Sequence, residues 1–313
     1  MLANEDTPFS LRPPPWFLQG EGWWIILSIL GPARKILDRL KHHQREKTKR
    51  PDSTHSDSLE LLSREVSQPS DGFRGGFGSV QILRYHMSPV GAYDELLLIP
   101  GVFKPPEQSS KRSPVFRITE IYVSTLGSIL NGRHNWNIPK KLARFEFIPL
   151  EGSPNKITVK VYALKSFSFT RSASSTSWCF EPQFFETPFF SMIIQRRLAS
   201  VNIPINLGHV PMLDLTLLQP PLQAAEPLQP NILELNRGAI GTSDWKRTKL
   251  DIRGRCGLCS FKGTLPGRAG QFADGEHFPD IQPYRFGFHF PRLHLQVQAP
   301  THIPSSSDPS EKQ

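Results

Sequence analysis

The sequence predicts one mainly β domain, built on a mostly antiparallel sheet with few short helices. The 313 residues include 30 prolines and 22 glycines, which argue against long helices and for many short strands joined by turns. Short runs rich in β-branched and aromatic residues recur along the chain, as strands require. Hydrophobic residues make up 38% of the chain, and 21 phenylalanines suit an apolar interior or a lined pocket.

Positive charge is concentrated in one short segment. The formal net charge is +9, and residues 31–50 hold eight Lys/Arg against two Asp/Glu. The rest of the chain is nearly neutral, so we expect no nucleic-acid partner. The most apolar run, residues 23–30, is shorter than the ~20 residues that span a bilayer, so we expect no membrane partner. No signal peptide is visible in residues 1–15, and three cysteines fit a reducing compartment, so we expect a cytoplasmic location.

The first third of the chain predicts a strand, a helix and a basic insertion. We expect disordered tails at residues 1–12 and 299–313, around a single domain at 13–298. Residues 23–30 predict the first strand. Residues 32–47 predict a short helix that frays after Leu40, with 41–58 solvated or disordered; a nuclear or anionic-lipid signal is the alternative. Whether the basic insertion at 31–75 is ordered or flexible is left open.

The following segments predict strands in succession. The glycine-rich residues 72–78 lack the Lys-Ser/Thr of a P-loop and predict a flexible lead into a strand at 79–86. Glu95 opens the next strand, at 96–99. Further strands are expected at 115–124, 143–148, 156–165 and 189–196, with a loop or variable hairpin at 165–182. The proline-rich residues 203–231 predict one strand and a long surface crossing.

Two adjacent lysines, Lys140 and Lys141, follow a polar stretch and a proline. Neighbouring ammonium groups repel, so each lowers the pKa of the other, and a neutral lysine is a nucleophile for carbonyl groups. We expect Pro139 to begin a short helical turn capped by Asn137, which would place Lys140 at the positive end of a helix dipole. A solvated face is the alternative for such a pair.

Cys256 and Cys259 form a single CxxC motif. A structural zinc site needs four ligands, and the sequence has no second CxxC. A redox site would need a helix after the motif, and the pattern predicts none. We therefore expect no metal and no cofactor.

Three segments resemble the acetoacetate decarboxylase family, and in particular its fungal branch. They are SPVGAYDE at residues 88–95, NGRHNWNIPKKLA at 131–143 and GTSDW at 241–245. The resemblance runs from about residue 13 to about residue 298. It implies the β-barrel-like fold of that family, in which the lysine after the proline forms a Schiff base with the substrate ketone. A second cation that activates this lysine is a known feature of acetoacetate decarboxylase.

The resemblance assigns roles to seven side chains. Lys140 is the Schiff-base lysine, Lys141 is its electrostatic neighbour, and Glu95 is a pocket carboxylate that orients substrate or moves a proton. Arg133 is an anion contact or a structural ion-pair partner. The remaining substrate-binding candidates are aromatic, with core packing as the alternative for the last: Tyr93, Trp136 and Trp245.

The implied function is a Schiff-base decarboxylase of a small-molecule β-keto acid, with a polyketide-like intermediate of secondary metabolism as one option. The family's bacterial enzymes have an arginine on the first strand near the substrate carboxylate, but residues 19–22 have none. This difference argues against acetoacetate itself. It leaves open a lysine-dependent aldolase or dehydratase, and a non-catalytic binding protein. Because family members are often oligomeric, the resemblance also allows a homo-oligomer.

Overall fold

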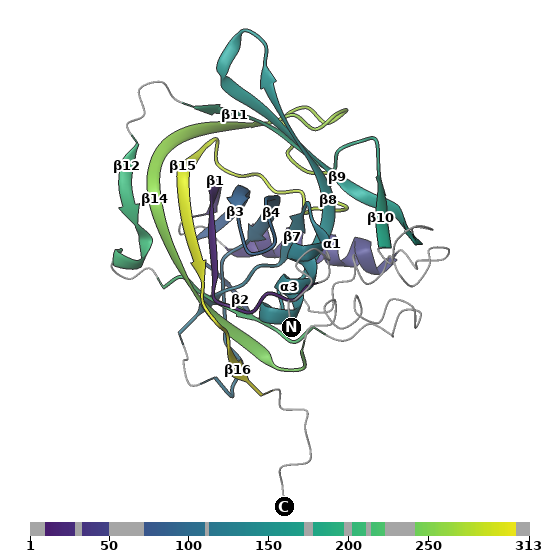
Figure 1. Cartoon of the computed structure of the whole chain (residues 1–313). Helices are drawn as coiled ribbons and strands as arrows, with labels where there is room; N and C mark the ends of the chain where they lie inside the picture. The colour runs from purple at the N-terminus through teal and green to yellow at the C-terminus, as the bar shows by residue number, and fades with distance from the viewer. Residues whose placement is uncertain are drawn as a thin grey trace, which may run out of the picture.

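A computed structural model describes residues 10–28, 33–49, 72–109, 113–171, 178–196, 202–210, 214–222 and 242–304. Nine strands pair in a closed ring, so the central sheet forms a barrel (Figure 1). Every contact in the ring is antiparallel except that of β7 with β8. In ring order the strands are β1 (Trp16–Ser28), β3 (Gly78–Met87), β4 (Tyr93–Ile99), β7 (Glu120–Val123), β8 (Lys140–Leu150), β9 (Ser153–Arg171), β11 (Phe190–Arg196), β14 (Trp245–Gly263) and β15 (Phe286–Val297).

Shorter strands extend this barrel at its edges. One group continues from the start of β14, and two further strands pair with β9 and with β14. The prediction of a mainly β fold with few helices is confirmed. The short elements are β2 (Phe73–Gly75), β5 (Val102–Phe103), β6 (Val115–Phe116), β10 (Trp178–Phe184), β12 (Ile203–Asn206), β13 (Thr216–Gln219), β16 (Thr301–Ile303) and the 3-10 helix η1 (Leu207–His209).

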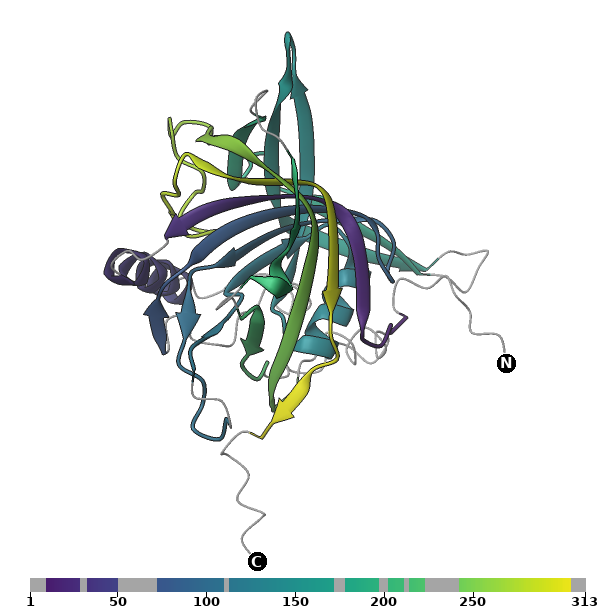
Figure 2. The same ribbon diagram turned by 90° about the vertical axis from the view of Figure 1, so that its left-hand side faces the viewer.

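Two helices cover opposite faces of the sheet (Figure 2). Helix α3 (Leu126–Trp136) connects the parallel strands β7 and β8 and packs its apolar side chains inside the barrel. Helix α1 (Ala33–Lys49) lies outside, where Leu40 joins the outer core. In the part of the chain that the structure describes, neither helix combines the length and the apolar character needed to cross a membrane.

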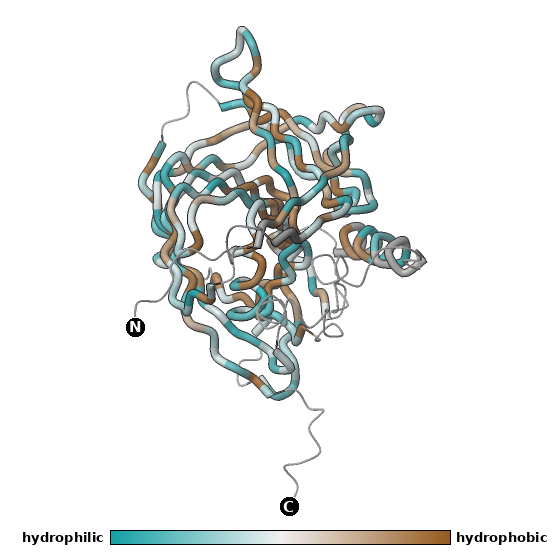
Figure 3. The backbone as a smooth tube through the Cα atoms, turned by 45° about the vertical axis from the view of Figure 1, so that its right-hand side comes forward, coloured by the Kyte–Doolittle hydropathy of each residue, from teal (hydrophilic) through white to brown (hydrophobic). Residues whose placement is uncertain are grey.

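Both faces of the central strands are buried, and each face has its own core. The inner core includes Trp24, Leu83 and Leu97, whereas the outer core includes Trp23, Ile82 and Leu98. Successive side chains on a strand point to opposite faces, so neighbours in sequence enter different cores. This explains why β3 is buried over its first six residues and β4 over nearly its whole length. Hydrophobic (brown) and hydrophilic (teal) stretches alternate along the tube in Figure 3.

Several sequence-based boundaries need correction at the ends of the chain. The first strand begins at Trp16 rather than at residue 23, and α1 continues to Lys49 instead of fraying after Leu40. Its later turns are held because His43 is buried against the sheet. Thr301–Ile303, expected in a polar tail, form β16 against β14. Of the basic insertion expected at 31–75, residues 31–32 and 50–71 lie outside the described residues.

Three further segments differ from expectation. The single strand expected at 115–124 is two strands, β6 and β7, interrupted where the Arg117 guanidinium stacks on Phe103, 4.4 Å from the ring centroid. Residues 126–136 form helix α3, where no helix was expected. Within 203–231, where one strand was expected, the described residues form two, β12 and β13. The antiparallel strands β9 and β10 agree with the hairpin that was one of the two expectations for residues 165–182.

Candidate active site

Helix α3 places two small residues against Lys140. Ser128 and Gly132 are four positions apart, so they lie on one face of the helix. A Cβ atom added to Gly132 would lie 2.6 Å from Cδ and 2.7 Å from Cε of Lys140. Glycine at this position therefore creates the space that the lysine side chain occupies.

Two asparagines of α3 hold the N-terminal segment of the chain. The Asn131 side chain accepts a hydrogen bond from the Arg12 amide at 2.6 Å and donates one to the Ser10 carbonyl at 3.1 Å. Asn135 donates to the Arg12 carbonyl at 2.8 Å. The polar residues of this stretch thus fix the helix in place, and residues 10–12, expected as part of a disordered tail, make these contacts.

Asn137 ends α3 and sets the direction of β8. Its backbone is left-handed, with φ 54° and ψ 28°, and the amides of Asn137 and Ile138 donate back to Arg133 and Gly132. A left-handed residue whose amide donates to the carbonyl four residues back is the αL type of helix C-cap. The expectation that Asn137 caps the start of a helix is therefore wrong. Lys140 follows the C-terminal end of a helix and begins a strand, so a helix N-terminus does not act on it.

Lys140 is a buried amine with two hydrogen-bond partners. Its Nζ lies 2.9 Å from Glu95 Oε2 on β4 and 2.9 Å from Ser128 Oγ on α3. Lys140 and Glu95 are each only 5% exposed. The Tyr93 ring centroid is 5.1 Å from Nζ, close enough for a cation on that nitrogen to interact with the ring. The structure therefore brings together three residues that the sequence predicted separately.

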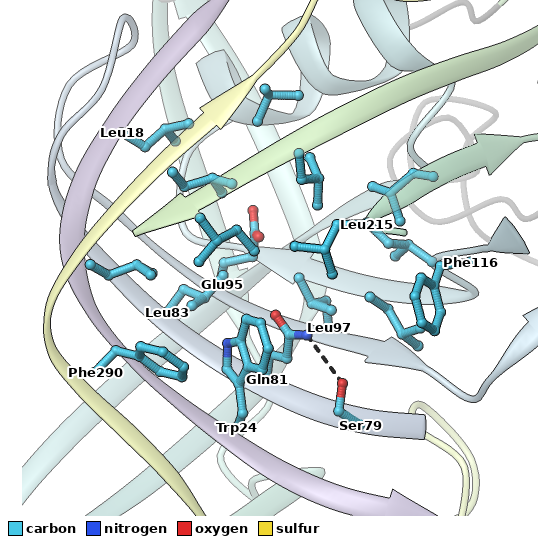
Figure 4. A pocket seen from close by; sticks show the side chains of 18 of the residues that line it. Leu18, Trp24, Ser79, Gln81, Leu83, Glu95, Leu97, Phe116, Leu215 and Phe290 are labelled. Atoms are coloured by element: carbon cyan, nitrogen blue, oxygen red, sulfur yellow. Dashed lines mark hydrogen bonds between the residues drawn. The ribbon is translucent and has the colours of Figure 1, made fainter. Parts of the chain in front are cut away.

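Lys140, Glu95 and Tyr93 line a cavity of about 280 Å³ inside the barrel. Most of its wall is aliphatic or aromatic, with side chains from β1, β3, β4, β14 and β15 (Figure 4). Among the described lining residues, the titratable side chains are Tyr85, Tyr93, Glu95, Lys140 and Cys256. The cavity is thus an apolar container in which Lys140 is the single cationic side chain that the described lining contains.

Two tyrosines near Lys140 stay protonated over the whole physiological range. Burial, and then the Glu95 carboxylate, raise the pKa of both Tyr85 and Tyr93 well above 10. A hydrogen bond with Ser128 acts in the opposite direction on the pKa of Tyr93. Their hydroxyl groups therefore serve as neutral hydrogen-bonding groups and not as bases.

Lys141 lies on the other face of the same strand. Its Nζ is 2.8 Å from Glu120 Oε2, and the second oxygen of that carboxylate is 3.1 Å from His43 Nε2 on α1. Lys141 is absent from the described cavity wall. Since strand neighbours point in opposite directions, Lys141 does not stand beside the Lys140 amine. The pairwise repulsion inferred from the sequence is replaced by an ion pair in the outer core.

Of the four residues expected to bind substrate, two line the cavity and two lie outside its described wall. Tyr93 and Trp136 line the cavity. Arg133 is buried outside the described wall and donates to the Lys140 carbonyl at 3.3 Å. Trp245 is also outside that wall, and the Arg117 guanidinium lies 5.2 Å from its ring centroid. Arg133 and Trp245 therefore stabilise the fold around the site.

The CxxC motif lies within β14, where its two cysteines are free and buried. Burial raises the pKa of Cys256 to about 11 and that of Cys259 to about 12. Cys256 faces the cavity and Cys259 faces the outer core. Away from the cavity, Asp274, Glu276 and His277 place three potential metal-ligand atoms together. There the Asp274 carboxylate already accepts the His277 ring nitrogen at 2.7 Å.

Two polar residues of the site were not expected from the sequence: Ser128, which contacts Lys140, and Gln81, which lines the cavity. Ser128 belongs to a helix that was not expected, so nothing indicated that it faces Lys140. Gln81 lies inside β3 between Val80 and Ile82, and a polar residue that alternates with apolar ones is typical of the solvent-facing side of a half-buried strand. Only the burial of both sheet faces reveals that Gln81 points inward.

Comparison with known proteins gives a fold and no sequence family. No protein-family model matches the chain, and no curated protein matches it. An acetoacetate decarboxylase from Legionella pneumophila subsp. pneumophila str. Philadelphia 1 superposes with TM-score 0.50 at 12% identity, over 94% of this chain and 89% of that one. A second acetoacetate decarboxylase gives TM-score 0.50 at 9% identity, over 95% and 93% of the two chains. The chain therefore has an acetoacetate decarboxylase-like fold.

Proposed function

We propose that this protein is a Schiff-base lyase that decarboxylates a β-keto acid through an imine on Lys140. The observation that carries the proposal is the buried amine in an apolar cavity, 2.9 Å from both Glu95 and Ser128. A surface lysine pair would offer neither the enclosure nor the carboxylate. The fold shared with acetoacetate decarboxylases agrees with this chemistry.

Proton transfer between Lys140 and Glu95 supplies the nucleophile. An ammonium and a carboxylate in contact become an amine and a carboxylic acid when one proton moves, and an apolar environment favours the neutral arrangement. A substrate that fills the cavity removes water from around the pair. The Lys140 amine then attacks the ketone carbon, while Glu95 holds the proton that the carbinolamine needs.

The remaining steps follow from the iminium cation. Glu95 protonates the carbinolamine oxygen, and water leaves as the iminium forms. The electrons of the bond to the carboxylate move into the iminium, carbon dioxide departs and a neutral enamine remains. The enamine carbon takes up a proton, and water hydrolyses the imine to release ketone and free Lys140. The Tyr93 ring, close to Nζ, stabilises the cationic stages.

A second candidate is an aldol, retro-aldol or dehydration reaction through the same imine. The observation that favours it is the absence of arginine from the described residues of the cavity wall. A substrate carboxylate would have only the Lys140-derived cation to pair with. A ketone or aldehyde without a carboxylate avoids this cost of burying an anion.

Reductive trapping tests the proposal. The protein is incubated with β-keto acids and simple ketones of increasing chain length, treated with borohydride and weighed by intact-mass spectrometry. We expect an adduct on Lys140 whose mass shows that carbon dioxide was lost when a β-keto acid was supplied. An adduct with no loss of carbon dioxide would favour the second candidate.

Matched variants localise the chemistry. Lys140→Met should abolish the adduct, whereas Lys141→Met should retain it because Lys141 faces the outer core. Glu95→Gln should slow adduct formation by about 10²–10⁴-fold, the usual range for loss of a general acid–base group. A folded protein that gives no adduct with any carbonyl compound would eliminate both imine reactions.

A further inference from the structure

One cross-strand row connects Lys140 to a polar group deep in the cavity. Lys140 is in register with Ile121, Ile121 with Leu97, and Leu97 with Gln81. All four side chains line the cavity. Strands lie about 4.8 Å apart, so three steps separate the Cα atoms of Lys140 and Gln81 by roughly 14 Å before curvature is considered.

Gln81 is a buried amide with unused hydrogen-bonding capacity. It is 8% exposed, and its Nε2 donates to Ser79 Oγ at 3.1 Å. Its other amide end has no hydrogen-bond partner among the described residues, and Figure 4 shows the carbonyl oxygen directed away from Ser79. A ligand that covers this oxygen without hydrogen-bonding to it would leave a buried polar group unsatisfied, at a cost of about 1–3 kcal/mol, so the position favours a ligand that can hydrogen-bond.

The walls between the two polar ends are apolar. Ile121 and Leu97 separate Lys140 from Gln81 along the row, and Trp24 lies next to Gln81 on β1. The two ends differ in charge. The Lys140 end carries the ion pair with Glu95, whereas Gln81 and Ser79 are neutral. A second ligand group at Gln81 must therefore be neutral, because a carboxylate there would be buried without a cation from the described lining.

From this geometry we propose that Gln81 determines specificity by binding a neutral polar group, such as a hydroxyl, at the far end of an otherwise hydrocarbon substrate. The substrate class is a carbonyl compound with a medium-length apolar chain and a distal hydroxyl or oxo group. A hydroxyl can donate to the free amide oxygen of Gln81 and accept from its second N–H. This inference rests on the proposed imine at Lys140 for the other end of the substrate.

Matched ligands test the role of Gln81 without any chemistry. Straight-chain methyl ketones are compared with ketones of equal chain length that carry a terminal hydroxyl. Binding is followed by the fluorescence of the cavity tryptophans, which include Trp16, Trp24 and Trp136. At the best chain length we expect the hydroxylated ligand to bind about fivefold to tenfold more tightly, as one neutral hydrogen bond allows.

Gln81→Leu should remove this preference while leaving the affinity for plain ketones within about twofold, since both side chains are of similar size. Leu97→Met, a volume-conserving change in the same row, is the control and should retain the preference. Gln81→Met replaces Gln81→Leu if circular dichroism shows that the first variant is unfolded. A preference that survives loss of the amide would overturn the inference, and so would equal binding of both ligands at every chain length.

The same titrations on Lys140→Met separate the two proposals. This variant cannot form an imine, so any hydroxyl preference that it keeps belongs to Gln81. If wild-type protein gives no borohydride adduct but retains a Gln81-dependent preference, the imine chemistry fails and the binding role stands. If borohydride adducts form but hydroxylated ketones bind no more tightly than plain ones, the binding role of Gln81 fails and the imine chemistry stands.

Discussion

At the scale of single residues, the wall of the barrel is one strand thick, and the two adjacent lysines lie on its two sides. Lys140 enters the cavity and pairs with Glu95, while Lys141 enters the outer core and pairs with Glu120. Both ion pairs are buried, so each carboxylate depends on its lysine. Removing one partner of a buried pair is costly because the other charge remains in a poorly solvated place.

We therefore expect Lys141→Met to reduce the free energy of unfolding by about 3–5 kcal/mol, the range for breaking a buried ion pair. Chemical denaturation provides the measurement. The double variant Lys141→Met with Glu120→Gln should regain part of that loss, because it removes both charges. A single variant as stable as the wild type would contradict a structural role for this pair.

The sequence was sufficient to find the lysine, its carboxylate and a neighbouring tyrosine, because Lys140, Glu95 and Tyr93 fall in short motifs. It was insufficient for the role of Lys141. Adjacent lysines come close on a helix end or a loop but point apart on a strand, and only the strand assignment at Lys140 distinguishes these cases. The inward position of Gln81 could not be predicted either, because burial of the second sheet face depends on distant parts of the chain.

At the scale of elements, the turn between α3 and β8 joins three separate parts of the fold. The Asn137 side chain donates to the carbonyls of Pro220 at 3.1 Å and Asp244 at 2.7 Å. Its oxygen accepts the Thr242 amide at 3.0 Å. The same residue supplies the left-handed backbone that ends the helix. The backbone of Asn137 therefore stabilises the end of α3, while its side chain stabilises contacts with distant segments. Substitutions can separate these two contributions to stability.

Asn137→Gly keeps the backbone conformation and removes the side-chain hydrogen bonds, whereas Asn137→Ala loses both. We expect Asn137→Gly to lower the free energy of unfolding by about 2–4 kcal/mol, because buried carbonyl and amide groups lose their partners. Asn137→Ala should cost about 1 kcal/mol more, since a residue with Cβ is unfavourable in the left-handed region. Thermal or denaturant unfolding measures both, and equal stability of the two variants would contradict a backbone contribution.

The elements that could be predicted were those with a strong local pattern, such as β3 and β4. Helix α3 could not, because Asn131 and Asn135 disfavour a helix locally, and their hydrogen bonds to Ser10 and Arg12 depend on a segment distant in sequence. The extent of α1 was likewise missed. Its polar final turns are anchored by His43, whose partner Glu120 is distant in sequence.

At the scale of the whole molecule, stability depends on pH through a buried lysine far from the cavity wall. Lys246 is 3% exposed and donates to the carbonyl of His134. Burial lowers the pKa of Lys246 from 10.5 to about 8, although the Asp244 carboxylate acts to raise it. Between these two values the unfolded chain holds a proton that the folded chain has released.

Stability should therefore rise with pH from about 8 to 10.5 relative to a variant without this amine. Below pH 8 both states are protonated, and the cost of the buried charge is constant. The contribution is at most about 1.4 kcal/mol per pH unit. Unfolding of wild type and Lys246→Met across this window measures it. The difference between them cancels the opposite trend from Cys256 and Cys259, whose pKa values are raised by burial. If the difference in unfolding free energy between the two proteins does not change with pH, the lowered pKa of Lys246 is refuted.

The two-sided sheet has a consequence for how such a protein can change. Alternate positions on one strand serve two separate purposes: Gln81 and Leu83 line the cavity, while Val80 and Ile82 pack in the outer core. A library that randomises only every second residue of β3 and β4, beginning at Ser79 and Tyr93, would therefore change the cavity wall without touching the outer core. New substrate scope can arise by a few alternating exchanges, with the architecture left as it is.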